Sequence, residues 1–405
     1  MKRLIINRNT EKTAMVLWLC GMIAFPFAQQ GQRIYELDEI PIVDVHTHYT
    51  DWDECVNIME GWGGTISVTL SGTSGHVNEM DYIENNLDGR ILICPRANGG
   101  PDGLGWSESD IQGFADDGFV GVKIWHQYND PPVSEMPDID SVLSKLGEVG
   151  LPAIGFHIAD PPELHYHVPD KYMVYQQDME KVIASHPATT FIMAHMFWLS
   201  CNDTSLDTLA MFFDRNPNLY ADISASFEYW NAPNPDYDKT RQFLIDYKDR
   251  LLFASDWSEG IAAGTWNSLR ELLETDNVLD IFWGRTGDDP SQELAGLELP
   301  LDVLNHIYYW NASRLIPGVK DRLMNLGYEL SDYPPGYEPV ALKNPAAQER
   351  GWQILCGQRI FFTDLSGRYH ASEVIYPQMT GGFELNYLSP DMQVLIHNGR
   401  VLLAY

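Results

Sequence analysis

Two histidines separated by one residue are the first chemical feature of the sequence, in the segment Asp44-Val45-His46-Thr47-His48. This segment ends an apolar, β-branched run, which favours a strand, and alternate side chains of a strand point to the same side. His46 and His48 therefore share a side and can bind one divalent metal, each through a ring nitrogen at about 2.0–2.1 Å. A lone His-x-His pair is more often two satisfied or exposed histidines than a metal site, so a metal site needs support from other residues.

Three later apolar runs also end in a residue that can titrate or bind a metal. In a parallel barrel the C-terminal ends of all strands open onto one face, so these residues should converge with the first pair of histidines. Chance alone would rarely put such a residue at the end of several runs. The three residues are His157 after Ala153–Phe156, His195 after Phe191–Ala194, and Asp256 after Leu252–Ser255.

The elements that would position these residues alternate between short β-rich runs and longer stretches. Several of the longer stretches have helical spacing, such as 172–185, 207–216, 265–274 and 301–315. Eight such units predict an α/β protein with a closed (β/α)₈ TIM-like barrel. An open doubly wound sheet is the alternative, which the lack of a Gly-rich phosphate loop after the first run disfavours. The eight runs are Ile42–His46, Thr65–Leu70, Ile91–Cys94, Phe119–Trp125, Ala153–His157, Thr190–His195, Leu219–Ile223 and Leu251–Ser255.

The two ends of the chain differ from the barrel region, which we place at residues 38–327. Basic residues precede an apolar run over 14–27, the order of a signal peptide at 1–28 that is cleaved near Ala28. We therefore expect export to the periplasm or the cell exterior; an uncleaved anchor is the alternative. Residues 328–345, rich in Pro, Tyr and Gly, predict a linker, and 346–405 a small β-rich C-terminal extension. Its expected strands are Trp352–Phe362, Glu373–Tyr376, Phe383–Tyr387 and Met392–Leu403.

Composition restricts the class of partner. With 44% hydrophobic residues over 405 positions, the chain can bury a substantial core. It carries 57 acidic against 26 basic residues, a formal net charge of −31, and such a surface repels nucleic acid and anionic lipid. We therefore expect a small-molecule substrate, no nucleic acid, and no membrane contact after processing.

Together these segments resemble the amidohydrolase superfamily, in particular the amidohydrolase-related family that includes decarboxylases and lactone hydrolases. The resemblance runs from about Pro41 to Leu315. Each motif is modest alone, whereas their order and spacing are specific. The motifs are Val43-Asp-Val-His-Thr-His48, Gly118-Phe-Val-Gly-Val-Lys-Ile124, Gly155-Phe-His-Ile-Ala-Asp160, Thr190-Phe-Ile-Met-Ala-His195, Asn218-Leu-Tyr-Ala-Asp-Ile-Ser224, Leu252-Phe-Ala-Ser-Asp256 and Asn311-Ala-Ser-Arg-Leu315.

By that resemblance His46, His48 and His157 would ligate one divalent metal, and Asp256 would complete the shell or contact the bound water. Zn²⁺ suits these donors, leaves room for water and lowers its pKa toward neutrality. Asp256 would then take the water proton, while His195 would polarise the substrate or protonate the leaving group. The implied activity is metal-dependent hydrolysis of an amide, ester or lactone bond in a small molecule.

Lys123, in the fourth run, has two interpretations. Some members of the superfamily carboxylate a lysine on this strand to bridge two metals. A free ammonium that binds an anionic substrate or pairs with Asp256 is the simpler interpretation, and we favour one metal.

Several other residues at the presumed open face are weaker candidates. Arg96 and His126, after the third and fourth runs, can bind a substrate carboxylate, and a salt bridge or loop contact is the alternative. Asp222 and Ser224 are expected to shape the pocket, and Asp44 to support the ligands.

Two other functions stay open at this point. The first is a metal-dependent decarboxylase (lyase) of the same fold, because a metal that polarises a carbonyl also stabilises a carbanion. A non-catalytic exported binding protein is the other. The complete set of metal-type and acid–base residues argues against the binding protein.

Overall fold

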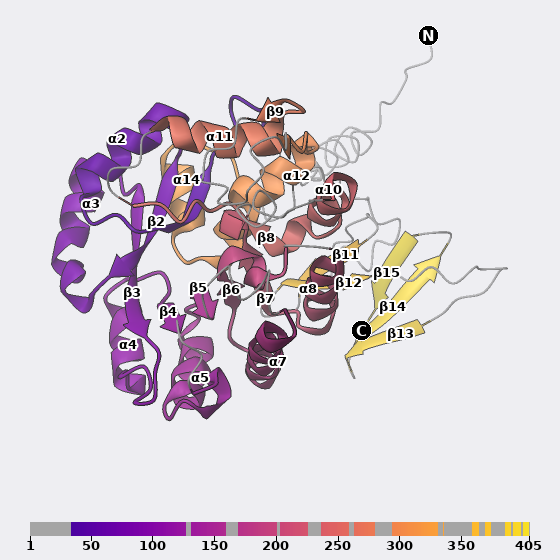
Figure 1. Ribbon diagram of the computed structural model, residues 1–405, viewed down its shortest axis with the longest axis horizontal. Helices are drawn as coiled ribbons and strands as arrows, with labels where there is room; N and C mark the ends of the chain where they lie inside the picture. The colour runs from indigo at the N-terminus through magenta and orange to yellow at the C-terminus, as the bar shows by residue number, and fades with distance from the viewer. Residues whose placement is uncertain are drawn as a thin grey trace, which may run out of the picture. The chain divides into compact units, whose positions relative to one another are not determined.

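A computed structural model gives the fold (Figure 1). The expected signal peptide over 1–28 and most of the expected linker over 328–345 lie outside the residues that it describes. The chain divides into two units, one of Arg33–Gly336 and one of Met1–Gln32 with Tyr337–Tyr405. The described residues are 34–126, 131–158, 169–200, 203–225, 236–258, 263–279, 294–330, 335, 359–363, 369–373, 385–389, 392–397 and 400–404.

Eight strands in consecutive order form the centre of the larger unit, and each pairs in parallel with the next (Figure 1). The predicted α/β class and TIM-like barrel are thereby confirmed. Apolar β-branched side chains, buried on both faces, are what a parallel strand of this type requires. The strands are β1 (Val43–Thr47), β2 (Ile66–Gly72), β3 (Ile91–Asn98), β4 (Lys123–His126), β5 (Ala153–Ile158), β6 (Phe191–Met193), β7 (Leu219–Asp222) and β8 (Leu251–Leu252).

The barrel is closed by backbone hydrogen bonds between residues 253–257 and residues 45–48, at the end of β1; we call this contact the seam. The Val45 N–H donates to the Phe253 carbonyl at 3.0 Å and the His48 N–H to the Trp257 carbonyl at 2.7 Å. In the opposite direction the Asp256 N–H donates to the His46 carbonyl at 2.7 Å. The eighth strand was predicted over Leu251–Ser255. Its regular part ends at Leu252, because residues 253–257 meet the first strand through the irregular hydrogen bonds of the seam; Asp256 has a left-handed φ of 63°.

Helices cover the outside of the barrel (Figure 1). Their ends follow ordinary capping rules: Asp51 and Ser107 cap the starts of α2 and α4, and Gly63 ends α2 in a left-handed conformation. The helix predicted over 301–315 contains a π-helical segment, η6 (His306–Trp310). The helices are α2 (Trp52–Trp62), α3 (Met80–Asn86), α4 (Glu108–Asp116), α5 (Ile139–Val149), α7 (Pro169–Ser185), α8 (Asp203–Arg215), α10 (Tyr237–Asp246), α11 (Ala263–Glu274), α12 (Leu301–Asn305), α13 (Asn311–Leu315) and α14 (Val319–Asn325).

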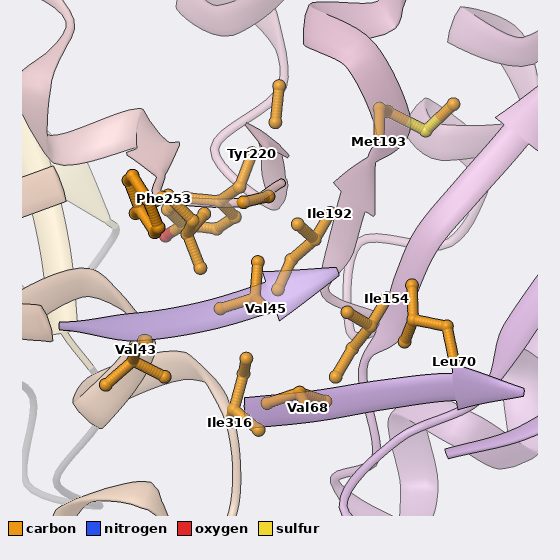
Figure 2. Close-up of a cluster of buried hydrophobic side chains, with 14 of the residues drawn as sticks. Val43, Val45, Val68, Leu70, Ile154, Ile192, Met193, Tyr220, Phe253 and Ile316 are labelled. Carbon is orange, nitrogen blue, oxygen red and sulfur yellow. The ribbon is translucent and has the colours of Figure 1, made fainter. Parts of the chain in front are cut away.

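Side chains from many strands fill one hydrophobic core. Val45, Val68, Ile154 and Ile192 come from β1, β2, β5 and β6 and gather in one buried cluster (Figure 2). This apolar packing supports the strands, and in barrels of this type function lies at the C-terminal ends of the strands. None of the helices among the described residues has the length and apolar character needed to cross a membrane.

Outside the barrel, the described strands pair antiparallel in small sheets. The strand predicted over Glu373–Tyr376 begins earlier, since β12 ends at Glu373, and the one predicted over Met392–Leu403 is divided into β14 and β15. In the larger unit β9 (Val278–Leu279) pairs with β10 (Leu294–Ala295). The C-terminal strands are β11 (Arg359–Thr363), β12 (Tyr369–Glu373), β13 (Leu385–Ser389), β14 (Met392–His397) and β15 (Arg400–Ala404), paired as β11–β12 and β13–β14–β15.

Candidate metal and acid–base site

Three side chains at the seam bring their donor atoms together, as the sequence predicts for His46, His48 and Asp256. Asp256 Oδ1 lies 3.1 Å from His46 Nε2 and 3.0 Å from His48 Nε2. The ligand atoms of the three residues all lie within 4.8 Å of one another. We call these three residues the donor cluster.

The seam itself positions the donor cluster. The hydrogen bonds from the Asp256 N–H to His46 and from the His48 N–H to Trp257 hold the two segments side by side. Asp44, buried below them, accepts from the Ser255 N–H at 3.1 Å, from Ser255 Oγ at 2.6 Å and from the His46 N–H at 3.2 Å. Burial raises the pKa of the Asp44 carboxyl to about 7, although these donors lower it. The expected supporting role of Asp44 thus consists of tying both strands together.

Both histidines of the donor cluster are oriented through their other ring nitrogen. His46 Nδ1 lies 2.8 Å from Asp222 Oδ2, and His48 Nδ1 lies 2.8 Å from Ser71 Oγ. Partners of this kind fix the ring and leave Nε2 available to a ligand. Two imidazole nitrogens and a carboxylate oxygen are the donors that Zn²⁺ and similar ions prefer, so the residues fit a divalent metal.

The charges around the donor cluster keep its carboxylate ionised. Burial acts to raise the pKa of Asp256, but His46, His48 and His195 together hold it well below its usual value. Burial is the main cause that lowers the pKa of His48 to about 4. At neutral pH Asp256 is therefore a carboxylate and His48 a neutral imidazole, which are the protonation states that metal ligands require.

Lys123 points into the barrel, as predicted from the alternation of β4. It is buried, and its Nζ lies 3.1 Å from His46 Nε2. Burial lowers the pKa of Lys123 to about 8, while Asp256 and Asp222 act in the opposite direction. Carboxylation by CO₂ requires the neutral amine, and a pKa near 8 leaves a fraction of it neutral at pH 7. The contact with His46 nevertheless brings the uncarboxylated Lys123 Nζ to the donor cluster, so a carboxylated lysine between two metals is not needed to explain its position.

Gly155 makes room for that contact, and the sequence reasoning missed it. Its φ of 59° lies in the left-handed region. A Cβ at this position would lie 2.4 Å from Leu70 Cδ1, 3.1 Å from Lys123 Nζ and 3.4 Å from His46 Cε1. A side chain at 155 would therefore displace both the lysine and the histidine. The glycine was part of a recognised motif, but only the packing explains why it is needed.

His195 lies beside the donor cluster at the start of a left-handed turn. The sixth strand was predicted to end at His195 but ends at Met193, because residues 195–198 all have positive φ, between 47° and 60°. This turn aims His195 Nε2 at Asp256, with 3.7 Å to Oδ2. Burial is the main cause that lowers the pKa of His195 to about 4. The ring is therefore neutral at pH 7.

His157, the third predicted histidine ligand, lies apart from the group of atoms that meet within 4.8 Å. Its ring packs edge-on against those of His195 at 5.1 Å, Trp198 at 5.6 Å and Trp125 at 6.3 Å. Burial, and then the neighbouring His195 ring, lower the pKa of His157 well below its usual value. Its Nδ1 is buried without a hydrogen-bond partner, as expected of a nitrogen that is available to a ligand. A ligand role for His157 stays a prediction.

Arg96 and His126 occupy different environments. The third strand continues past Cys94 to Asn98, so Arg96 lies within β3 as the register partner of Lys123. Its guanidinium stacks 4.2 Å above the Trp125 ring and remains partly exposed. His126 is fully buried, and its Nε2 lies 2.7 Å from the Pro131 carbonyl. For His126 this is the loop contact that the sequence offered as the alternative to substrate binding. A contact with substrate stays a prediction for both Arg96 and His126.

Comparison with solved structures gives barrels of low identity. A probable 2-pyrone-4,6-dicarboxylic acid hydrolase from Acinetobacter baumannii, with citric acid bound, is 11% identical with a TM-score of 0.43, covering 68% of this chain and 99% of its own. An amidohydrolase from Burkholderia multivorans with bound Zn is 13% identical with a TM-score of 0.43, covering 68% and 98%. A TIM-barrel protein from Bordetella bronchiseptica is 12% identical with a TM-score of 0.45, covering 71% and 100%.

Comparison at the level of sequence is more specific. No curated protein matches the chain. A family model described as amidohydrolase matches residues 107–317, just over half of the chain, and this range contains His157, His195, Asp222 and Asp256. It agrees with the resemblance that the motifs indicate. The chain belongs to the amidohydrolase family.

Proposed function

We propose that this protein is an exported, metal-dependent hydrolase that cleaves an amide, ester or lactone bond in a small molecule. One observation carries the proposal: the Nε2 atoms of His46 and His48 meet a carboxylate oxygen of Asp256, while their Nδ1 atoms are held elsewhere. These residues would hold one divalent ion, for which Zn²⁺ is the best match, with His157 as a further ligand. Bound there, the ion would supply Lewis-acid polarisation of the scissile carbonyl and a water of lowered pKa.

The chain's own residues provide the proton transfers. Asp256 is the most exposed member of the donor cluster, with 30% of its side chain accessible, so water and substrate can reach it. In hydrolysis the attacking water loses a proton and the leaving oxygen or nitrogen gains one. Asp256 accepts the first proton, and His195, 3.7 Å from Asp256 Oδ2, carries a proton to the leaving group. His195 is neutral at rest, so it can receive that proton first.

Local positive charge favours a substrate that bears a carboxylate. The chain has a formal charge of −31, yet Arg96 and Lys123 are neighbours in register at the site. Stacking on Trp125 holds the Arg96 guanidinium flat, which suits two parallel hydrogen bonds to a carboxylate. An anionic group bound by Arg96 would direct the scissile bond toward Asp256.

The metal part of the proposal is tested by elemental analysis of the purified protein. We expect about one ion per chain, lost in His48→Ala and retained in His76→Ala, a half-buried histidine on η1 (Ser74–Glu79) that is not part of the donor cluster. Two ions per chain would show that Lys123 acts as a carboxylated bridge. Full activity of protein from which all metal has been removed would overturn metal dependence.

The reaction and the export are tested separately. Hydrolysis of a lactone, ester or amide panel in H₂¹⁸O should place the label in the product carboxylate. Release of CO₂ from carboxylated substrates without such labelling would instead establish the decarboxylase. Export predicts that chains recovered outside the cytoplasm begin just after Ala28, and a full-length N-terminus there would contradict cleavage.

A further inference from the structure

One buried carboxylate is connected to two histidines of the site. Asp222 Oδ2 lies 2.8 Å from His46 Nδ1. Asp222 Oδ1 accepts from the backbone N–H of His195 at 2.9 Å, from the N–H of Ser224 at 3.2 Å and from the Ser224 hydroxyl. Ser224 Oγ in turn lies 2.9 Å from His195 Nδ1. All four residues are buried, so water does not replace these partners.

These contacts determine which nitrogen of each ring carries the proton. Asp222 accepts at Oδ1 from two backbone N–H groups and the Ser224 hydroxyl, and its Oδ2 faces His46 Nδ1, so both oxygens act as acceptors of a carboxylate. The Ser224 hydroxyl has one proton, which it donates to Asp222, and its oxygen must accept from the Nδ1–H of His195. His46 likewise donates its Nδ1–H to Asp222. In both rings the proton held by these partners is therefore on Nδ1, and Nε2 is the nitrogen that faces the donor cluster.

We infer that Asp222 and Ser224 are positioning residues that set the tautomers of His46 and His195, Asp222 for the first ring and Ser224 for the second. The expected effect of these tautomers on activity rests on the proposed function. The tautomers themselves follow from the hydrogen bonds and do not depend on that function. From the sequence alone, both residues were expected only to shape the pocket. Their connections give them separable roles.

The two roles can be separated because the two oxygens of Asp222 have different surroundings. In Asp222→Asn the backbone N–H groups of residues 195 and 224 require an acceptor, so the amide oxygen occupies the Oδ1 position. The amide NH₂ then faces His46 Nδ1, which must accept, and the proton moves to Nε2. The new Nε2–H of His46 then points at Asp256 and the Lys123 ammonium. A protonated Nε2 cannot bind a metal. Ser224→Ala leaves this arrangement intact and removes only the acceptor for His195 Nδ1.

The test is ¹⁵N NMR of the histidine rings in metal-free protein, with signals assigned from His46→Gln and His195→Gln. In the wild type we expect Nδ1–H on both rings. Asp222→Asn should move the His46 proton to Nε2 and leave His195 unchanged; Ser224→Ala should alter only His195. Ser67→Ala, a buried serine on β2 whose hydroxyl contacts Thr47 Oγ1 at 2.7 Å, is the matched control and should alter neither.

Metal affinity and kinetics give a second readout. Asp222→Asn should weaken Zn²⁺ binding by about 10–100-fold or more, whereas Ser224→Ala should leave it within about twofold and reduce kcat more than it raises KM. Wild-type tautomers in both variants, or equal losses of affinity in both, would overturn the inference. A wild type that binds no Zn²⁺ but shows the expected tautomers would overturn the proposed function and leave the inference standing. Asp222→Asn preserves the shape of the side chain, so it tests the inference even if Ser224→Ala does not fold.

Discussion

Replacement of Gly155 by alanine should damage both stability and the site. The left-handed φ of 59° costs an alanine about 1 kcal/mol or more. The new Cβ would lie 2.4 Å from Leu70 Cδ1, a contact that the buried leucine can relieve only by moving, and such overpacking costs about 1–3 kcal/mol. The smaller freedom of the unfolded alanine chain offsets about 0.4–1 kcal/mol. We expect a net loss of about 2–3 kcal/mol.

Urea unfolding monitored by tryptophan fluorescence measures this loss, with Gly113→Ala as the control. Gly113 lies within α4, and a Cβ there would have no neighbour within 4 Å, so its replacement should stabilise the protein by up to about 1 kcal/mol. The predicted 3.1 Å approach to Lys123 Nζ should also weaken Zn²⁺ binding in Gly155→Ala. Equal stability of Gly155→Ala and wild type, with unchanged metal affinity, would refute the packing argument.

Three further predictions follow from single contacts. Burial, and then Lys248, lower the pKa of His306 to about 4 in the folded protein. As the pH falls below about 6.5, this histidine therefore takes up a proton in the unfolded chain before it does so in the folded one. The free energy of unfolding should then fall by up to about 3 kcal/mol between pH 6.5 and 4. Urea midpoints over this range should fall less steeply in His306→Gln, and an unchanged slope would contradict the assignment. Arg96→Gln should raise KM for a carboxylate substrate about 10–100-fold with little change in kcat, whereas Arg215→Gln, at an exposed arginine, should change neither; equal KM values in wild type and Arg96→Gln would remove Arg96 from the substrate site. Asp256→Asn should lower kcat by at least about 100-fold, which a pre-steady-state assay with saturating Zn²⁺ would check; near-normal turnover would exclude Asp256 as the base.

The barrel was predictable because its strands are short apolar runs at regular intervals. The errors lie where geometry departs from the regular strand. β6 stops at Met193 because a left-handed turn follows, and the regular part of β8 covers Leu251–Leu252 because it meets β1 through irregular hydrogen bonds. β3 continues through Pro95, where the sequence suggested an end. Local propensity does not contain these tertiary constraints.

The donor cluster was predictable because strand ends of a parallel barrel share a face. The residues that orient it were not, since their contacts join distant positions: His46 and Asp222 are 176 residues apart, and His48 and Ser71 are 23 apart. An acidic residue at the end of the seventh run was the available signal for Asp222. Nothing in the sequence alone separates it from an acid that merely lines the pocket.

The seam also determines when the site can exist during synthesis of the protein. Asp44 and Ser255, which it joins, are 211 residues apart, so β1 leaves the ribosome long before its partner. A nascent chain that ends before residue 251 contains His46, His48, His157 and His195 but no donor cluster. Contacts of such long range carry the largest loop-closure entropy and form late. A metal that binds only the closed barrel would therefore stabilise the product of the last folding step, the pairing of residues 253–257 with β1.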